Sequence, residues 1–332
     1  MTFLPQIRII VPSAQVSSYT TGVFSLPSAK QPFTPPVRGL FGGGGTSTGN
    51  SNVIDYIDIT TLGNATDFGD LVSARSELAG NVSSSTRALF DYNSAGSVFG
   101  MDYVTIATEG NATKFGDFGS QMLETAGLSN STRGLFGGGR ISSPYVDIST
   151  RIEYVTIAST GNGTSFGDQN VGRRYAAGTA SSTRGLFAGG YRNDGSNARN
   201  DIEYVTIAST GNGTDFGDLT TDAYGLGAAS SGTRAIFAGG NQDSGRRNVI
   251  DYVTIATTGN ATDFGDLSQS VSGVCATGTT TRAVISIGDN GTSKLNIIEY
   301  ITFASTGNSV DFGDLTVARG VAAANSAGHG GL

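Results

Sequence analysis

Acidic side chains recur at two fixed places along this sequence of 332 residues. One acid precedes each of six regularly spaced tyrosines, and one aspartate follows each of six Phe-Gly pairs. Two carboxyl groups held close together can carry out general acid–base catalysis. Sixfold recurrence instead marks a residue that every copy of a structural unit needs, so we expect the acids to pair with the repeated arginines or to cap turns. The first set is Asp55, Asp102, Glu153, Glu203, Asp251 and Glu299, and the second is Asp70, Asp117, Asp168, Asp218, Asp266 and Asp314.

The sequence is poor in the other residue types that catalysis and metal binding use. It has one histidine, His329, in a glycine-rich tail, and one cysteine, Cys275, so it can form no intramolecular disulfide. A Ser–His or Cys–His pair would have to recruit His329 from that tail. Residues 193–201 offer oxygen atoms for calcium but lack the EF-hand pattern and its bidentate glutamate. We therefore predict no enzymatic activity, no cofactor and no metal site.

The acids belong to a repeat that occurs six times. Its copies are marked by Phe-Gly-Asp triplets spaced 47, 51, 50, 48 and 48 residues apart, and tyrosines keep the same spacings. An arginine opens a short apolar run in each copy. Self-similarity with a period near 50 residues predicts a propeller or a solenoid. The markers are Phe68, Phe115, Phe166, Phe216, Phe264 and Phe312; Tyr56, Tyr103, Tyr154, Tyr204, Tyr252 and Tyr300; and Arg38, Arg87, Arg133, Arg184, Arg234 and Arg282.

Each copy divides into four strand candidates, named a to d. Strand a consists of small residues, which suit the innermost strand of a blade. Strand c has apolar side chains on both faces and must be covered on both. The Gly-Asn pair between c and d tolerates the positive φ of tight hairpin turns, so we expect c and d to be antiparallel neighbours. In the fourth copy the four candidates are residues 175–181, 183–188, 202–209 and 214–219.

The two ends of the repeat array are out of phase. The first copy starts at strand b with Val37, whereas residues 319–327 have the character of strand a. We therefore expect the C-terminal strand to complete the first blade, which removes the free edges of an open array. The prediction is an all-β chain, with a six-bladed β-propeller of four-stranded antiparallel blades over residues 37–332. An extended N-terminal arm over residues 1–36, rich in Pro, Ser and Thr, precedes it.

The order of features resembles the kelch repeat over about residues 37–327. Gly-Gly follows strand b, an acid and Tyr lie in strand c, an aromatic lies in strand d, and Arg75 and Arg319 precede the next strand a. Two departures stand out: Phe216 and its equivalents replace the usual Trp, and Gly-Gly is lost in the second copy and reduced to Gly288 in the last. The copper site of galactose oxidase, a kelch enzyme, needs two histidines, and His329 is alone. The Asp-box repeats of sialidases contain Trp, which this chain lacks.

The wording Tyr-Val-Thr-Ile-Ala-Ser-Thr-Gly-Asn, with residues 18–22 and 26–29 of the arm, looks like kelch-like propeller proteins of tailed phages of marine bacteria. This resemblance implies a non-catalytic structural protein of the virion (a tail, fibre or decoration component) in a multi-subunit assembly. Residues 1–36 would then bind other virion proteins, and the propeller would face protein or host-surface partners. The alternatives are a carbohydrate-binding adhesin or receptor-binding head and, least favoured, a glycan hydrolase.

Charge and hydropathy argue against two classes of partner. The chain has 20 basic and 27 acidic residues, a net charge of −7, and no basic run, which disfavours nucleic acid and anionic membranes. No apolar stretch approaches the ~18 residues of a membrane span, and the N-terminal sequence lacks the pattern of a secretory signal. Five Asn-x-Thr sequons coincide with the predicted c–d turns, so we interpret them as turn chemistry rather than glycosylation. They begin at Asn64, Asn111, Asn162, Asn212 and Asn260.

The connections between strands fall into two groups. In an up-and-down blade the a–b and c–d turns share one face, here called the turn face, and the b–c and d–a connections share the other, the loop face. The turns repeat almost unchanged, whereas the loops vary in length and content. Variable loops on a rigid scaffold often carry recognition, and Tyr and Arg are enriched at binding hot spots. The alternative is that these loops are solvated and bind nothing. The predicted partner-binding residues are Arg140, Tyr145, Arg173, Arg174, Tyr191, Arg192, Tyr224, Arg246 and Arg247.

Overall fold

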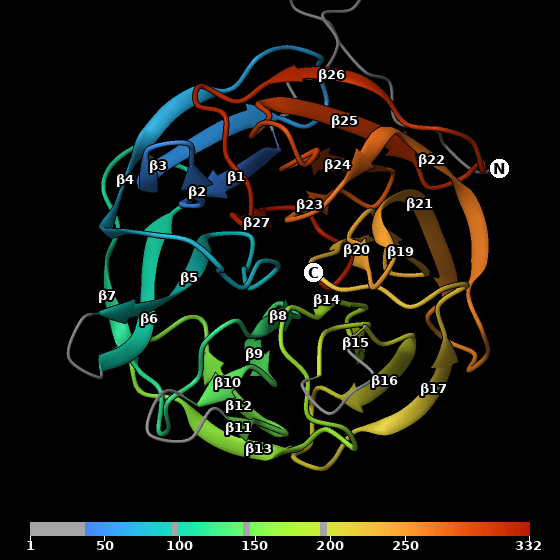
Figure 1. Cartoon of the computed structure of the whole chain (residues 1–332). Coiled ribbons are helices and arrows are strands. Elements are labelled where there is room, and N and C mark those ends of the chain that lie inside the picture. Colours follow the sequence, from blue (N-terminus) through green and yellow to red (C-terminus); the bar gives the residue numbers. More distant parts are fainter. Residues whose placement is uncertain (1–36, 95–97, 142–146, 193–197) are drawn as a thin grey trace, which may run out of the picture. The chain divides into compact units, whose positions relative to one another are not determined.

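The computed structural model describes residues 37–94, 98–141, 147–192 and 198–332. The chain divides into two units, Met1–Pro35 and Pro36–Leu332, and the predicted arm over residues 1–36 lies outside the described residues. In the second unit, strands are the regular elements of the described ranges, and they form six small antiparallel sheets around a central axis (Figure 1). This unit is a six-bladed β-propeller, as the repeat predicts.

Blade 4 shows the common pattern, with each strand hydrogen-bonded to the next in chain order. Its strands are β14 (Ala177–Ala180), β15 (Arg184–Ala188), β16 (Asp201–Thr206) and β17 (Thr214–Asp218). Blade 3 has β8 (Ala126–Ser129), β9 (Arg133–Gly137), β12 (Arg151–Thr156) and β13 (Thr164–Asp168). Blade 5 has β18 (Gly227–Ser230), β19 (Arg234–Ala238), β21 (Gly245–Thr254) and β22 (Thr262–Val271). Blade 6 has β23 (Cys275–Gly278), β24 (Arg282–Ser286), β25 (Ile297–Thr302) and β26 (Val310–Asp314).

Blade 1 is built from both ends of the propeller sequence. Its innermost strand, β27 (Ala323–Ser326), pairs antiparallel with β1 (Arg38–Gly42), and Leu40 lies opposite Asn325. The blade continues outward with β3 (Gly49–Asp58) and β4 (Thr66–Arg75). The C-terminal strand therefore completes the first blade and leaves β1 with a partner on each side. Four two-residue strands, β2 (Gly45–Thr46), β10 (Arg140–Ile141), β11 (Asp147–Ile148) and β20 (Asn241–Gln242), lie in the b–c connections.

Blade 2 departs from the predicted four strands. Its sheet contains β5 (Arg87–Ser94), β6 (Val98–Thr105) and β7 (Thr113–Asp117), and only an isolated bridge joins Ser83 to Ala88 on the inner side. The cause is readable in the sequence: 19 residues separate Phe68 from Arg87, against 18 in the next four copies. The extra residue places Asn81 at a φ of 62° and breaks the regular pairing.

A stack of three side chains recurs in every blade. In blade 4 the Arg184 guanidinium lies over the Tyr204 ring at 4.3 Å from its centre, and Tyr204 packs edge-on against Phe216 at 6.2 Å. Arg184 also donates a hydrogen bond of 2.7 Å to the carbonyl of Ile255 in blade 5. Each repeated arginine thus stacks on a tyrosine of its own blade and donates to a carbonyl of the next blade. Of the two roles expected for the repeated acids, pairing with these arginines is therefore not the one observed; the acids instead accept hydrogen bonds from backbone N–H and hydroxyl groups, as described below.

The Thr-Gly-Asn motif also joins neighbouring blades. Strand c of blade 4 ends at Thr206, so residues 207–213 form a longer connection than the predicted tight turn. This connection lies against strand d of blade 3: the Gly211 N–H donates to the Phe166 carbonyl at 2.9 Å, and the Asn212 Oδ1 accepts the Asp168 N–H at 3.1 Å. A Cβ on Gly167 would lie 2.2 Å from the Gly211 carbonyl oxygen, so the approach requires glycine in Phe-Gly-Asp.

Replacing Asn212 by Ala is expected to lower the free energy of unfolding by about 1 kcal/mol, because it removes one hydrogen bond between blades. Thr214→Ala destroys the same sequon but not this bond, so it is expected to change the stability by less than about 0.5 kcal/mol. Urea denaturation of both variants measures the difference. Equal effects of the two substitutions would contradict the structural role of the asparagine.

Candidate functional site

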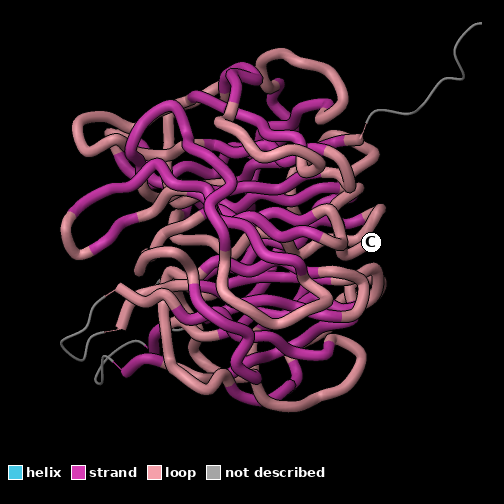
Figure 2. Tube along the Cα trace, turned by 90° about the vertical axis from the view of Figure 1, so that its right-hand side faces the viewer, coloured by secondary structure: helices cyan, strands magenta, loops and turns pink. Residues whose placement is uncertain are grey.

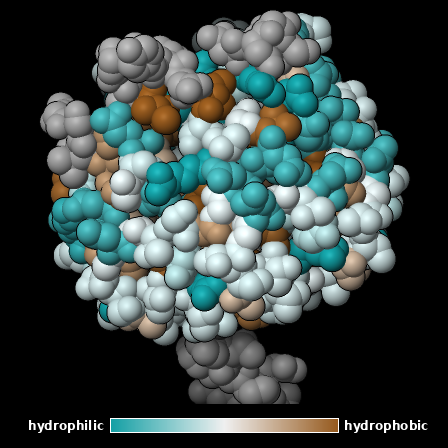
Figure 3. Space-filling model, turned by 90° about the horizontal axis from the view of Figure 1, so that it is seen from below, coloured by the Kyte–Doolittle hydropathy of each residue, from teal (hydrophilic) through white to brown (hydrophobic). Residues whose placement is uncertain are grey.

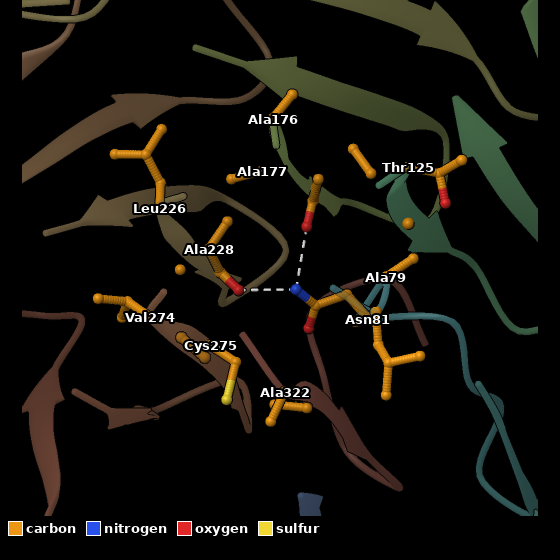
Figure 4. A pocket seen from close by; sticks show the side chains of 18 residues that line it. Ala79, Asn81, Thr125, Ala176, Ala177, Leu226, Ala228, Val274, Cys275 and Ala322 are labelled. Carbon is orange, nitrogen blue, oxygen red and sulfur yellow. Dashed lines mark hydrogen bonds between the residues drawn. The ribbon is translucent and has the colours of Figure 1, made fainter. Parts of the chain in front are cut away.

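The first strands of the blades surround a narrow channel on the axis. Small residues line it, and it encloses a cavity of about 50 Å³, which is well below the size of pockets for drug-sized ligands. The amide of Asn81 crosses the channel from blade 2 and donates to the carbonyls of Gly178 at 2.9 Å and Ala228 at 2.7 Å (Figure 4). The bulge that the extra residue creates in blade 2 therefore ties blade 2 to blades 4 and 5.

The C-terminal tail lies across the turn-face end of this axis, where Figure 1 places the C-terminus. His329 is only 5% exposed. Its Nδ1 accepts the Gly331 N–H, so its Nε2 carries the proton and donates to the carbonyl of Ser83 at 3.0 Å. The Gly330 N–H donates to the Ser230 carbonyl at 3.0 Å. The single histidine is therefore part of a latch between the tail and the blades.

Burial lowers the pKa of His329 from 6.5 to about 4, and it raises the pKa of Asp91 in blade 2 from 3.8 to about 6. Between pH 6.5 and 4 the unfolded chain binds more protons at His329 than the folded protein does, so this histidine lowers the stability as the pH falls. Asp91 has the opposite effect on stability. Between pH 6 and 3.8 the folded protein binds more protons at Asp91 than the unfolded chain does, so this aspartate raises the stability as the pH falls.

When the pH falls from 7 to 4, the free energy of unfolding of His329→Gln is therefore expected to decrease by up to about 3 kcal/mol less than that of the wild type. Urea denaturation at several pH values measures this difference, in which the contributions of the other groups cancel. Asp91→Asn is the control of opposite sign, since it should increase the loss of stability on acidification. Parallel stability curves for the wild type and His329→Gln would contradict the buried, neutral histidine.

The loop-face mouth of the channel is a ring of six equivalent positions. Each lies nine residues after the phenylalanine of a Phe-Gly-Asp triplet, and each has a φ between 52° and 67°. Backbone hydrogen bonds run along the ring, including Gly225 N–H to the Tyr175 carbonyl at 2.8 Å. A non-glycine residue in this conformation costs on the order of 1 kcal/mol or more. The six residues are Glu77, Glu124, Tyr175, Gly225, Gly273 and Val321.

Large polar and aromatic side chains gather on one side of this mouth. The buried Glu124 carboxylate pairs with Arg140 and, at 3.0 Å, with Arg174. The Arg174 guanidinium lies between two rings, 5.1 Å from the centre of Tyr175 and 4.9 Å from that of Tyr191. Tyr224 packs edge-on against Tyr191 at 5.1 Å. With Glu77, which accepts the Tyr175 hydroxyl at 2.9 Å, we call these seven residues the mouth cluster.

The opposite side of the mouth is low. There the ring positions are Gly273 and Val321, and the pairs that bridge the d–a and b–c connections are Gly45 with Gly320 and Ser272 with Asp289. Burial raises the pKa of Tyr175, with the nearby Glu124 and Glu77 adding to the effect, so its hydroxyl stays protonated and donates. The large side chains of the mouth cluster thus lie on one side of the mouth, and the ring positions on the other side carry Gly273 and Val321.

Four of the predicted contact residues, Arg140, Arg174, Tyr191 and Tyr224, come together in the mouth cluster. Arg246 lies elsewhere on the loop face and pairs with Asp289 at 2.8 Å. Arg192 is half-buried, and Tyr145 lies outside the described residues.

For two other residues the prediction of an exposed contact side chain is wrong. Arg173 is 0% exposed and pairs with Glu203, and Arg247 is 4% exposed and pairs with Asp251 at 2.9 Å. A carboxylate buried between blades needs a cation, and these arginines supply it. Arg247 does so because Ala223 stands in blade 4 where blade 3 has Arg173.

The repeated acids before the tyrosines are structural. All six are at most 2% exposed, and each accepts a hydrogen bond from the residue four places after the phenylalanine of the Phe-Gly-Asp triplet in the preceding blade. Glu203, for example, accepts the N–H groups of Asn170 at 2.8 Å and Val171 at 3.2 Å. Within the ranges that the structure describes, no group of three or more His, Cys, Asp or Glu side chains is arranged to hold a metal ion.

The sequence prediction missed Glu77, Glu124 and Tyr175. The signal that could have found them is positional, because the two glycines at equivalent places in later copies hint at a left-handed backbone. The residue types themselves vary too much from copy to copy to stand out in the sequence.

The fold and the mouth cluster together define a closed propeller with one asymmetric, polar and aromatic surface at the end of its axis. Neither the protein-family models nor the curated proteins compared with this chain give a match. In the described part of the chain no helix is long and apolar enough to cross a membrane.

Proposed function

We propose that this protein is a non-catalytic structural protein of a tailed-phage particle, docked through its N-terminal arm and making protein or host-surface contacts through its loop face. One observation carries the proposal: the side chains that repeat in all blades are used in bonds between blades, whereas the unrepeated Tyr, Arg and Glu side chains gather at the loop-face mouth. Variable loops on a rigid scaffold are where binding residues concentrate.

The position of Val37 supports this arrangement. Its carbonyl accepts the Ile59 N–H at 3.0 Å, and it packs close to Gly328 beside the C-terminal tail, on the turn face. Figure 2 shows the C-terminus at one end of the propeller axis, and the strands run between this face and the opposite one. Val37 thus lies on the face opposite the mouth cluster. Anchoring and contact can then occur at once.

The side of the propeller seen in Figure 3 is a poorer contact surface. In the view of Figure 3 it is mostly hydrophilic or neutral, with apolar residues in small separate patches. Scattered exposed apolar residues are normal on a soluble surface, whereas binding sites expose larger continuous areas. The kelch-like repeat and the phage-like wording of the sequence support the assignment to a virion.

Two altered proteins test this proposal. A chain that lacks residues 1–31 is expected to keep its melting temperature but to lose association with other virion proteins. The double variant Tyr191→Ala, Tyr224→Ala is expected to keep that association and to lose attachment to host cells. The proposal fails if both altered proteins associate and attach like the wild type, or if the purified chain releases sugars from a host glycan.

A further inference from the structure

From the mouth cluster we infer a binding site for the uncharged terminal residue of a saccharide. This inference rests on the proposed function and deepens it, because it names the ligand class and the residues that a host-surface contact would use. It starts from the difference between the copies: three ring positions carry the large side chains Glu77, Glu124 and Tyr175. The other three positions are Gly225, Gly273 and Val321.

The charges of the mouth cluster favour a neutral ligand. Its two cations, Arg140 and Arg174, both pair with Glu124, and its second anion, Glu77, accepts the Tyr175 hydroxyl. Because the formal charges cancel and the buried Glu124 is already paired, the cluster presents no net field to attract an ionic ligand. A phosphate or a uronate would meet these carboxylates, and a lysine side chain would meet the guanidinium groups. A ligand rich in hydroxyl groups can use the same side chains as donors and acceptors without this repulsion.

The aromatic rings supply the apolar part of such a site. Tyr175, Tyr191 and Tyr224 are each half-buried, and Tyr224 contacts both of the other rings. Rings that are held by each other and by Arg174 lose little conformational freedom when a ligand binds. A pyranose ring has apolar C–H faces and polar edges, so it matches phenol rings flanked by charged hydrogen-bonding groups.

The shape of the mouth favours a chain end. The cavity below the ring is about 50 Å³, large enough for a hydroxymethyl group or for one or two water molecules but too small for a sugar ring. A terminal sugar would therefore lie above the ring against the tyrosines, with an exocyclic group directed into the channel. The low side of the mouth, with Gly45 and Gly320, leaves space for the rest of the saccharide.

Tyr175 permits a sharp test, because two other blades show the same backbone without a side chain. Gly225 and Gly273 occupy the equivalent position with φ of 67° and 62°, against 55° for Tyr175. Tyr175→Gly should therefore remove the ring and its hydroxyl while relieving a strained backbone. A variant that loses binding without losing stability separates a binding role from a structural one.

The experiment uses the purified full chain and the methyl glycosides of glucose, galactose, mannose and N-acetylglucosamine, with methyl glucuronide as the charged probe. Binding is measured by isothermal titration calorimetry and by saturation-transfer NMR. We expect at least one neutral glycoside to bind saturably, and at least about tenfold more tightly than the glucuronide. Tyr175→Gly should weaken this binding by at least about tenfold at an unchanged or raised melting temperature. Lys294→Ala, on the loop face of blade 6, should bind like the wild type.

Three results would overturn the inference: no saturable binding of any neutral glycoside, tighter binding of the glucuronide, or full affinity in Tyr175→Gly. If the chain still attaches to host cells through the mouth cluster while it binds none of the sugars, the partner is a protein; the saccharide site is then refuted, and the proposed function stands. If the sugars bind but attachment and association with virion proteins are absent, the proposed function fails and the saccharide site stands.

Discussion

Deletion of residues 315–332 is expected to abolish cooperative unfolding of the propeller. The deletion removes β27, leaves β1 as an unpaired sheet edge, and takes away Ala323 and Ala324, both 0% exposed. It also removes Arg319, whose guanidinium lies 2.9 Å from the fully buried Asp55 carboxylate. Leaving a buried charge without its partner costs about 3–5 kcal/mol by itself, which is a large part of the 5–15 kcal/mol that stabilises a typical protein.

The measurement is thermal unfolding followed by circular dichroism, together with size-exclusion chromatography for aggregation through the exposed edge. Deletion of residues 329–332 alone is the matched control. It removes the His329 latch but keeps β27, so this protein should still melt cooperatively, at a lower temperature. A soluble protein without residues 315–332 that melts at the wild-type temperature would show that the C-terminal strand does not close the ring.

Replacement of Arg173 by Ala is expected to cost about 3–5 kcal/mol, although its sequence context resembles that of a solvated loop arginine. Its side chain is 0% exposed, pairs with Glu203 and also donates to the carbonyl of Asp201 at 2.9 Å. The substitution leaves Glu203 charged and buried between two blades. Arg246→Ala is the comparison within the same face: its pair with Asp289 is partly exposed, so the expected cost is less than about 1 kcal/mol.

Urea denaturation of the two variants measures both costs. A double variant, Arg173→Met with Glu203→Met, tests the cause, because removal of both charges should recover most of the stability lost in Arg173→Ala. Similar stabilities of Arg173→Ala and Arg246→Ala would contradict the buried ion pair. No recovery in the double variant would indicate that the hydrogen bonds of Arg173 to backbone carbonyls, rather than the charge of Glu203, carry its contribution.

The architecture could be predicted from the sequence because the same pattern of strands and turns occurs in six copies. The period, the four strands and the phase shift between Val37 and residues 319–327 lead to a closed propeller, and the structure has this fold. The sequence also shows the extra residue before Arg87 as a longer spacing. It does not show the effect of this residue, because the hydrogen bond of the Asn81 amide across the channel depends on the width of the channel.

The candidate site was predictable only in part. The choice of the loop face followed from the variation between copies, and four predicted residues do meet at the mouth. The burial of Arg173 and Arg247 could not be predicted, because an arginine in a variable loop looks the same whether or not a neighbouring blade places a carboxylate against it. Glu124 and Tyr175 were hidden for a related reason, since the property they share with Gly225 is a backbone angle rather than a residue type.

The bond between Ala327 and Arg38 has a consequence for how the chain is connected. The Ala327 N–H donates to the Arg38 carbonyl at 3.2 Å, and in blade 4 the corresponding bond joins Ser181 to Arg184 at 2.9 Å inside a continuous turn. Strands a and b of blade 1 are therefore joined by the same hydrogen bond as in an ordinary a–b turn, although no covalent turn connects them. A short peptide could bridge the two positions, and new termini could be opened between Ser182 and Thr183. Such a circular permutant would start its first blade in another copy and keep the same ring of blades.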